Sequence, residues 1–169
     1  LKAGDVQAIH RELVARGFPA GAPQALTRKL TLPGSNIEEE ARFTTVRLPR
    51  GALLGGRLYY CRHETPQLIW HTPFQSHDNG ALGIVCFTIA VPDPAGEIAN
   101  YERILDTPAT IGTDGSARIR MGHAELELLT PEALRIKLGT LACDANDFDG
   151  RKRDSYMAMV TIKVRDLAA

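Results

Sequence analysis

The sequence has no excess of either charge, because 20 lysines and arginines balance 20 aspartates and glutamates. A chain without a net field does not attract nucleic acid or anionic membranes as a whole, so we expect neither as a partner. Long apolar segments are also missing: there is no run of about 18 apolar residues and no charged-then-apolar leader. The sequence therefore predicts neither a membrane anchor nor an export signal.

Cysteine is scarce as well. Cys61, Cys86 and Cys143 are scattered, odd in number and free of CxxC spacing. This pattern argues against a disulfide framework or a zinc knot and favours reduced thiols in a cytoplasmic protein. The chain also lacks GxSxG, GxGxxG and phosphate-loop motifs, so hydrolases with a nucleophile elbow and the common nucleotide-binding classes are not expected.

The sequence does contain a regular succession of helix and strand signals. Asp5 is placed to cap a first helix that Gly17 ends, Asp93-Pro94 opens a second helix, and Thr130-Pro131 opens a third. Strands are expected over residues 26–32, 41–48, 57–62, 82–91, 109–111, 117–121, 124–129 and 156–164. The second group of elements repeats the helix and three strands of the first and adds a leading strand that the first lacks.

The stretch 57–91 is the richest in side chains that carry chemistry. Pro66 and Pro73 are expected to break any helix between its two strands, so polar groups are presented where the chain crosses from one strand to the next. The second of these strands, 82–91, is apolar enough to be covered on both faces. The acidic run 38–40 is assigned to a solvated loop edge. The stretch holds three of the five histidines, His63, His71 and His77, and the only tryptophan, Trp70, and His71 beside Pro73 is expected to be exposed.

Four segments resemble the glyoxalase-like branch of the vicinal oxygen chelate superfamily: YYCRHETPQLIW, QSHDNGALGI, VPDPAGEIANYERIL and YMAMVTIKVRDLAA. The most distinctive parts are C-x-H-x-T-P-x-x-x-W and H-x-N-G-A. The resemblance implies an α+β fold in which repeated βαβββ modules form curved mixed sheets around a cleft. It also implies a partial set of modules: an incomplete module over residues 1–73, a complete one over 74–150, and the opening strand of another within 151–169.

Enzymes of this superfamily hold one divalent metal with histidine and glutamate from the first and last strands of paired modules. The resemblance therefore implies a site for iron, manganese, nickel or zinc that acts as a Lewis acid on a small oxygenated metabolite, in a lyase, isomerase or dioxygenase reaction. The matching positions are His77 and Glu127 for the metal. Glu125 lies on the same strand face by the two-residue period and is, with His63, the candidate further ligand or catalytic base.

Two other functions stay open, because two ligands do not complete a metal site. The chain is also similar to the bleomycin-resistance members, which implies a non-catalytic protein that sequesters a small aromatic or planar ligand between Trp70, Tyr59 and Phe74. A structural domain without any site is the third possibility. Strand edges left open by the missing module parts predict a homodimer.

Overall fold

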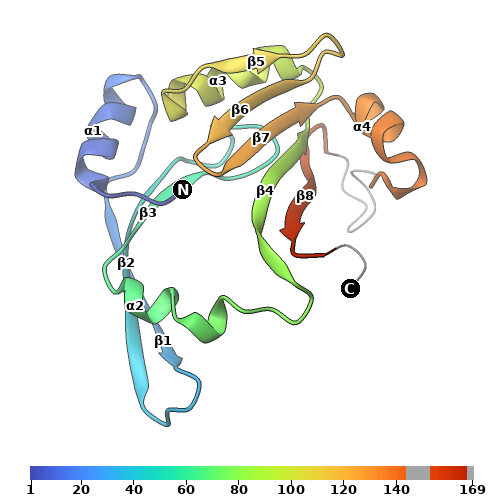
Figure 1. Ribbon diagram of the computed structural model, residues 1–169. Helices are drawn as coiled ribbons and strands as arrows, with labels where there is room; N and C mark the ends of the chain where they lie inside the picture. Colours follow the sequence, from blue (N-terminus) through green and yellow to red (C-terminus); the bar gives the residue numbers. More distant parts are fainter. Residues whose placement is uncertain (144–152, 167–169) are drawn as a thin grey trace. The chain divides into compact units, whose positions relative to one another are not determined.

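The computed structural model describes residues 1–143 and 153–166, which form a mixed α+β structure with two curved, open sheets (Figure 1). This confirms the fold class. Contacts divide the chain into two compact units. Of the described residues, unit 1 takes those up to 52, 57–82 and those from 164 on, and unit 2 takes 53–56 and those from 83 to 163. The module boundaries stay a prediction, because packing units do not test sequence repeats, and the boundary at 150 lies outside the described residues.

Unit 1 begins with a helix and continues with a three-stranded antiparallel sheet. The Asp5 side chain accepts hydrogen bonds from the backbone N–H groups of Gln7 and Ala8, and Gly17 has a φ of 83° just after the helix. Both end signals are therefore confirmed. The elements are α1 (Val6–Ala15), β1 (Gln24–Thr31), β2 (Glu38–Arg47) and β3 (Tyr59–His63), with sheet order β1-β2-β3.

The first three residues lie parallel to β3. They occupy the place of the leading strand that the predicted order of elements lacks in this unit. Lys2 forms a parallel bridge with Cys61. The N–H of Ala3 donates to the carbonyl of Cys61 at 2.9 Å, and the N–H of Cys61 donates to the carbonyl of Leu1 at 2.8 Å. Three residues thus provide the pairing that a full first strand provides in a complete βαβββ unit.

Helix α1 covers one face of the β1-β2-β3 sheet. Leu13 on the helix and Val46 on β2 are both buried to 1% exposure. Tyr60 lies on the same face, and burial raises its pKa, with smaller effects from the charges of Arg16 and Glu12 on α1. Because side chains alternate along a strand, α1 leaves the odd-numbered residues of β2 and β3 on the opposite face.

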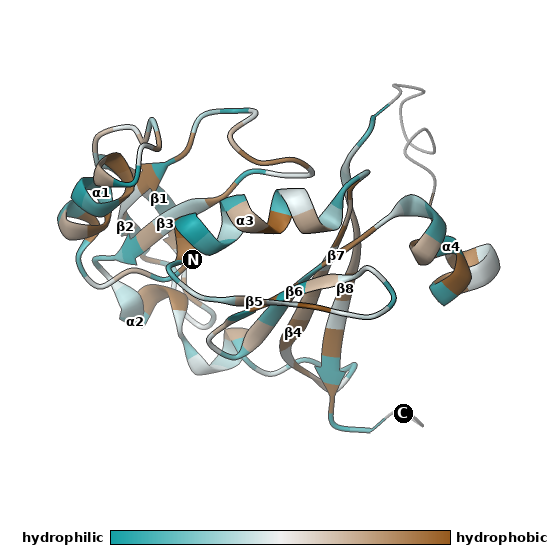
Figure 2. Cartoon of the chain, turned by 90° about the horizontal axis from the view of Figure 1, so that it is seen from above, coloured by the Kyte–Doolittle hydropathy of each residue, from teal (hydrophilic) through white to brown (hydrophobic). Residues whose placement is uncertain are grey.

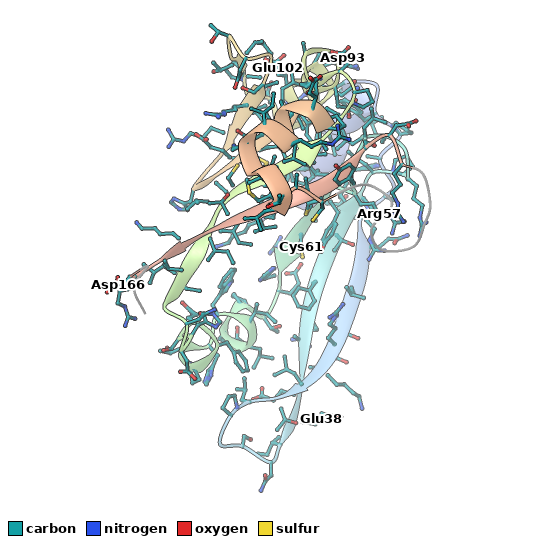
Figure 3. The ribbon with its side chains drawn as sticks, turned by 90° about the vertical axis from the view of Figure 1, so that its right-hand side faces the viewer. Glu38, Arg57, Cys61, Asp93, Glu102 and Asp166 are labelled. Atoms are coloured by element: carbon teal, nitrogen blue, oxygen red, sulfur yellow. The ribbon has the colours of Figure 1, made fainter. Side chains whose placement is uncertain are left out.

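The acidic run 38–40 was expected in a loop, but it belongs to β2. Glu38, Glu39 and Glu40 pair with residues 29–31 of β1, and the carboxylate of Glu38 lies 2.8 Å from the ammonium of Lys29. Figure 3 shows Glu38 at the far end of this hairpin from Arg57 and Cys61. The ladder hydrogen bonds and the opposite charge on β1 offset the low strand propensity of glutamate.

Two short helical turns occupy the crossing after β3, where no helix was expected. They are α2 (Pro66–Ile69) and the 3₁₀ turn η1 (Thr72–Phe74). Each proline stands in the first turn of its element, where the missing N–H has no partner to lose and the fixed φ suits a helix. The two prolines therefore start these turns.

Unit 2 is built on a five-stranded mixed sheet of order β5-β6-β7-β4-β8. Residues Cys86–Ala90 of β4 run parallel to Glu125–Leu129 of β7, and the β5-β6 and β6-β7 pairs are antiparallel. The elements are β4 (Ala81–Ala90), α3 (Pro94–Leu105), β5 (Ala109–Ile111), β6 (Ala117–Met121), β7 (Ala124–Leu129), α4 (Pro131–Leu138), the 3₁₀ turn η2 (Gly139–Leu141) and β8 (Tyr156–Val164).

Helix α3 packs on one face of this sheet, and α4 packs on the other. The inward residues Ile98, Tyr101 and Ile104 of α3 are buried, and Figure 2 shows hydrophobic and hydrophilic residues mixed along the helix, as an amphipathic helix requires. On the other face, Leu134 of α4 packs with Ala90 and Leu129. None of the helices in the described part of the chain is long and apolar enough to cross a membrane.

Strand β4 was expected to be covered on both faces, but this is true of its last part only. Thr88, Ile89 and Ala90 are buried, whereas Leu82 and Ile84 are 57% and 44% exposed. The buried part coincides with the part that pairs with β7. The buried residues of β4 are therefore among those that pair with β7. The apolar sequence of β4 does not show how far this pairing extends.

Residues 53–56 belong to unit 2, where they form hydrogen bonds with α3 and pack closely against Ile89 of β4. The N–H of Leu54 donates to Glu97 at 2.8 Å, and the hydroxyl of Tyr101 donates to the carbonyl of Leu54 at 3.3 Å. Gly55 has a φ of 75°, and a Cβ atom there would lie 2.1 Å from Cγ2 of Ile89. Only glycine fits this position without strain.

We predict that Gly55→Ala lowers the free energy of unfolding by about 2 to 5 kcal/mol, because a left-handed backbone and an overpacked contact add their costs. Urea denaturation measures this change. Gly56→Ala is the matched control, since an added Cβ there meets no atom within 4 Å. Equal stability of the two variants would show that the approach of Gly55 to Ile89 is wrong.

Candidate functional site

The face of the β1-β2-β3 sheet that α1 leaves uncovered lines a pocket of about 680 Å³ in unit 1. The residues that each strand contributes are two apart in sequence, as the alternation of side chains requires. Ile69 and Trp70, from the crossing after β3, complete the apolar part of the lining. The central strands contribute Phe43, Thr45 and Arg47 from β2 and Tyr59, Cys61 and His63 from β3.

Three aromatic rings form a continuous surface in this pocket. Phe43 meets His63 edge to face with ring centroids 5.2 Å apart, and His63 stacks on Trp70 at 5.6 Å with an interplanar angle of 15°. The turn of α2 holds Trp70 in place: its N–H donates to the carbonyl of Pro66 at 2.8 Å, and its own carbonyl accepts from the side chain of Gln75 at 2.6 Å. Such a surface suits a flat ring.

His63 is a titratable group of the pocket whose pKa is shifted. Burial lowers its pKa, and the nearby charge of Lys2 lowers it further. The imidazole is therefore neutral at pH 7, and its Nδ1 atom is buried without a hydrogen-bond partner among the described residues. The ring of His63 is therefore an uncharged part of the pocket lining.

The structure separates the three residues predicted to hold a planar ligand. Tyr59 and Trp70 both line the pocket, and both are about half exposed. Phe74 is not part of the lining, and its ring lies against His71 at 5.7 Å. Sequence reasoning missed Phe43 and Cys61, although the two-residue period of their strands was a signal that would have found them. Burial raises the pKa of the Cys61 thiol, so it is a neutral part of the lining.

A second cluster of polar side chains surrounds Glu127 in unit 2. Its side chain is 3% exposed, and both carboxylate oxygens accept hydrogen bonds. The Nζ atom of Lys137 lies 2.8 Å from each oxygen, Nη2 of Arg118 lies 2.8 Å from Oε1, and the hydroxyl of Thr88 donates to Oε2 at 2.9 Å. Two cations and a hydroxyl thus compensate one buried carboxylate.

Strand register and one helix bring these groups together. Thr88 and Glu127 are partners in the parallel β4-β7 pair, and Arg118 and Glu127 are partners in the antiparallel β6-β7 pair. Lys137 comes from α4, one helical turn after the buried Leu134 that anchors this helix on the sheet. The lysine therefore reaches the carboxylate because α4 is packed on the same face.

Burial alone would raise the pKa of Glu127, but the hydrogen bonds from Lys137 and Thr88 outweigh it and lower the value below 4.5. The carboxylate is ionised at pH 7 and is already paired with two positive charges. A divalent cation at this position would have to displace Lys137 and would experience repulsion from Arg118. As it stands, Glu127 is a partner for cationic side chains and does not fit an open metal site.

The remaining predicted ligands are located as follows. His77 is exposed in a turn that the N–H of Gly80 closes by donating to its carbonyl at 3.0 Å. Glu125 is half-buried two residues before Glu127. Among residues 1–143 and 153–166, no three His, Cys, Asp or Glu side chains are grouped so that they could hold a metal ion. The assignment of His77 and Glu127 as joint ligands stays a prediction, because the two residues belong to different units.

We predict that Glu127→Gln destabilises the chain by about 1 to 3 kcal/mol at pH 7, because it leaves Lys137 and Arg118 without their counter-charge. Glu125→Gln is the matched control on the same strand face. A lowered carboxyl pKa contributes stability above pH 4.5, and this contribution is lost as the pH falls through the folded-state value. Urea denaturation should therefore show the difference between wild type and Glu127→Gln shrinking in acid, and a pH-independent difference would contradict the ion-pair assignment.

Comparisons with known proteins agree with this architecture. The family model described as "Glyoxalase-like domain" matches residues 1–105. No curated protein matches the chain significantly. Among solved structures, a hypothetical protein from Staphylococcus aureus is similar in fold, with a TM-score of 0.60 and 9% identity over 76% of this chain. The chain spans half the length of that protein, since the match covers 50% of it. Because the family match includes more than half of its 169 residues, the chain belongs to the glyoxalase-like domain family.

Proposed function

We propose that this chain is a small-molecule binding domain whose ligand is an aromatic or otherwise planar compound held in the pocket of unit 1. The observation that carries the proposal is the aromatic surface of Phe43, His63 and Trp70 on one wall of a pocket of about 680 Å³. Sites for small molecules are concave, mostly apolar and about 300 to 1,000 Å³ in volume. Both the size and the lining agree with a single ligand of this class.

The sequestering type of function, without chemistry on the ligand, is favoured over metal-assisted catalysis. Unit 2 pairs its buried carboxylate Glu127 with Lys137 and Arg118. In unit 1 the pocket presents rings, a neutral imidazole and cationic side chains, but its described lining residues include no carboxylate that could hold a metal. A lyase, isomerase or dioxygenase reaction needs a group that stabilises developing charge on substrate oxygens. A divalent metal bound to Glu127 would supply this and is the competing proposal, which requires Lys137 to leave the carboxylate.

The ligand-binding proposal predicts that N-phenyl-1-naphthylamine, a neutral planar probe, quenches the fluorescence of Trp70, the only tryptophan of the chain. Tyr59→Ala should weaken binding about three- to tenfold, because it removes part of the aromatic lining. Phe74→Ala is the matched control, since this ring lies outside the lining. Absence of quenching, or equal loss in both variants, would refute the pocket as the binding site.

The competing proposal predicts a stoichiometric transition metal in protein purified without chelators, and loss of that metal in Glu127→Gln. Elemental analysis by mass spectrometry measures both quantities. Glu132→Gln, at an exposed position of α4, controls for a general change in surface charge. A stoichiometric metal that depends on Glu127 would favour catalysis over sequestration, whereas metal-free protein that still binds the naphthylamine probe would favour sequestration.

A further inference from the structure

The charged residues that line the pocket of unit 1 all have the same sign. Lys2, Arg28, Arg47 and Arg57 belong to the lining, and no aspartate or glutamate does. The whole chain has equal numbers of acidic and basic residues. A concave surface with charges of one sign focuses its potential on the solvent inside it. The pocket is thus a local positive site on a neutral chain.

Within the described residues, the side chains of two arginines in this pocket lack the ion-pair partners that Arg62 and Arg118 have. Arg62 pairs with Glu64 at 3.2 Å, and Arg118 pairs with Glu127 at 2.8 Å. The side chains of Arg28 and Arg57 are exposed and form neither an ion pair nor a hydrogen bond within residues 1–143 and 153–166. A guanidinium has five donors in a planar fork, so these two side chains offer unused donors at the pocket.

The remaining two cations are held against the aromatic and polar lining. The Nζ atom of Lys2 lies 5.9 Å from the centre of the Trp70 ring, and Nε of Arg47 donates to the hydroxyl of Thr45 at 3.3 Å. Arg47 is also the cross-strand partner of Tyr59. Rings and cations therefore line one pocket, so a single small ligand has access to both.

We infer that the ligand is a planar anion, a ring system that carries a carboxylate, sulfonate or phosphate group, and that Arg28, two residues from the strand partner of Phe43, binds its charge. The inference rests on the proposed binding function and adds the chemical class of the ligand. The ring contacts the His63 and Trp70 surface, and the guanidinium group of Arg28 donates to the anionic oxygens. The volume of the pocket admits one small molecule and excludes a polymeric anion as its occupant.

Two probes with the same rings test this inference. 8-Anilino-1-naphthalenesulfonate is N-phenyl-1-naphthylamine with one added sulfonate, so the difference between their dissociation constants isolates the contribution of the charge. We expect the sulfonate to bind about three- to tenfold more tightly to the 169-residue chain, since a hydrogen-bonded charge at a partly exposed site contributes at this level. Added salt should weaken the sulfonate alone.

Arg28→Gln should abolish the preference for the sulfonate and keep the affinity for the neutral probe. Arg42→Gln is the matched control, because Arg42 stands on β2 but on the opposite face from Phe43 and Thr45. Fluorescence titration gives both constants, and circular dichroism verifies that each variant is folded.

The outcomes distinguish this inference from the proposed function. Equal affinities of the two probes, or an equal loss of sulfonate binding in Arg42→Gln, would overturn the anion assignment while the pocket remains a binding site. Failure of both probes to bind would overturn the proposed function itself. A second copy of the chain as the occupant would appear as a concentration-dependent dimer in sedimentation that excludes both probes, and it would also overturn the assignment.

Discussion

The parallel pairing of Cys86–Ala90 with Glu125–Leu129 is the constraint on which unit 2 depends. It joins the first and last strands of a βαβββ unit into one continuous sheet. Helix α3 covers one face, and α4 packs on part of the other. In unit 1, residues 1–3 pair with β3 in the same parallel sense, and α1 covers one face of that sheet. In each unit, the polar and aromatic groups of interest stand on the face that the first helix leaves open.

The charged side chains on these two faces have different roles. In unit 2, the buried charge of Glu127 is satisfied within the chain by Lys137, Arg118 and Thr88, since a buried carboxylate without partners would be far too costly. In unit 1, Arg28 and Arg57 face a pocket that contains no acidic side chain. The first arrangement uses its charges for stability, and the second leaves its charges available for a ligand.

Part of the candidate site was predictable from the sequence. Tyr59, His63 and Trp70 were selected because they stand in the segment richest in rings and histidines, and all three line the pocket. The two-residue period correctly placed Glu125 and Glu127 on one strand. The partners of Glu127 were not predictable, because Lys137 reaches the carboxylate only after α4 has packed on the sheet. Arg28 likewise enters the pocket through the register of β1 with β2.

The sequence by itself determined where α1, α3 and α4 begin and the repeated order of helix and strands. Asp5, Asp93 and Thr130 cap their helices as expected, because a cap depends on groups within three or four residues. The pattern of residues also identified the family. Only the tertiary structure decided that Glu38–Glu40 belongs to a strand, that residues 1–3 pair with β3, and that the pocket collects cations from four segments. These outcomes depend on groups far apart in the chain, and their energies arise only when the sheets have formed.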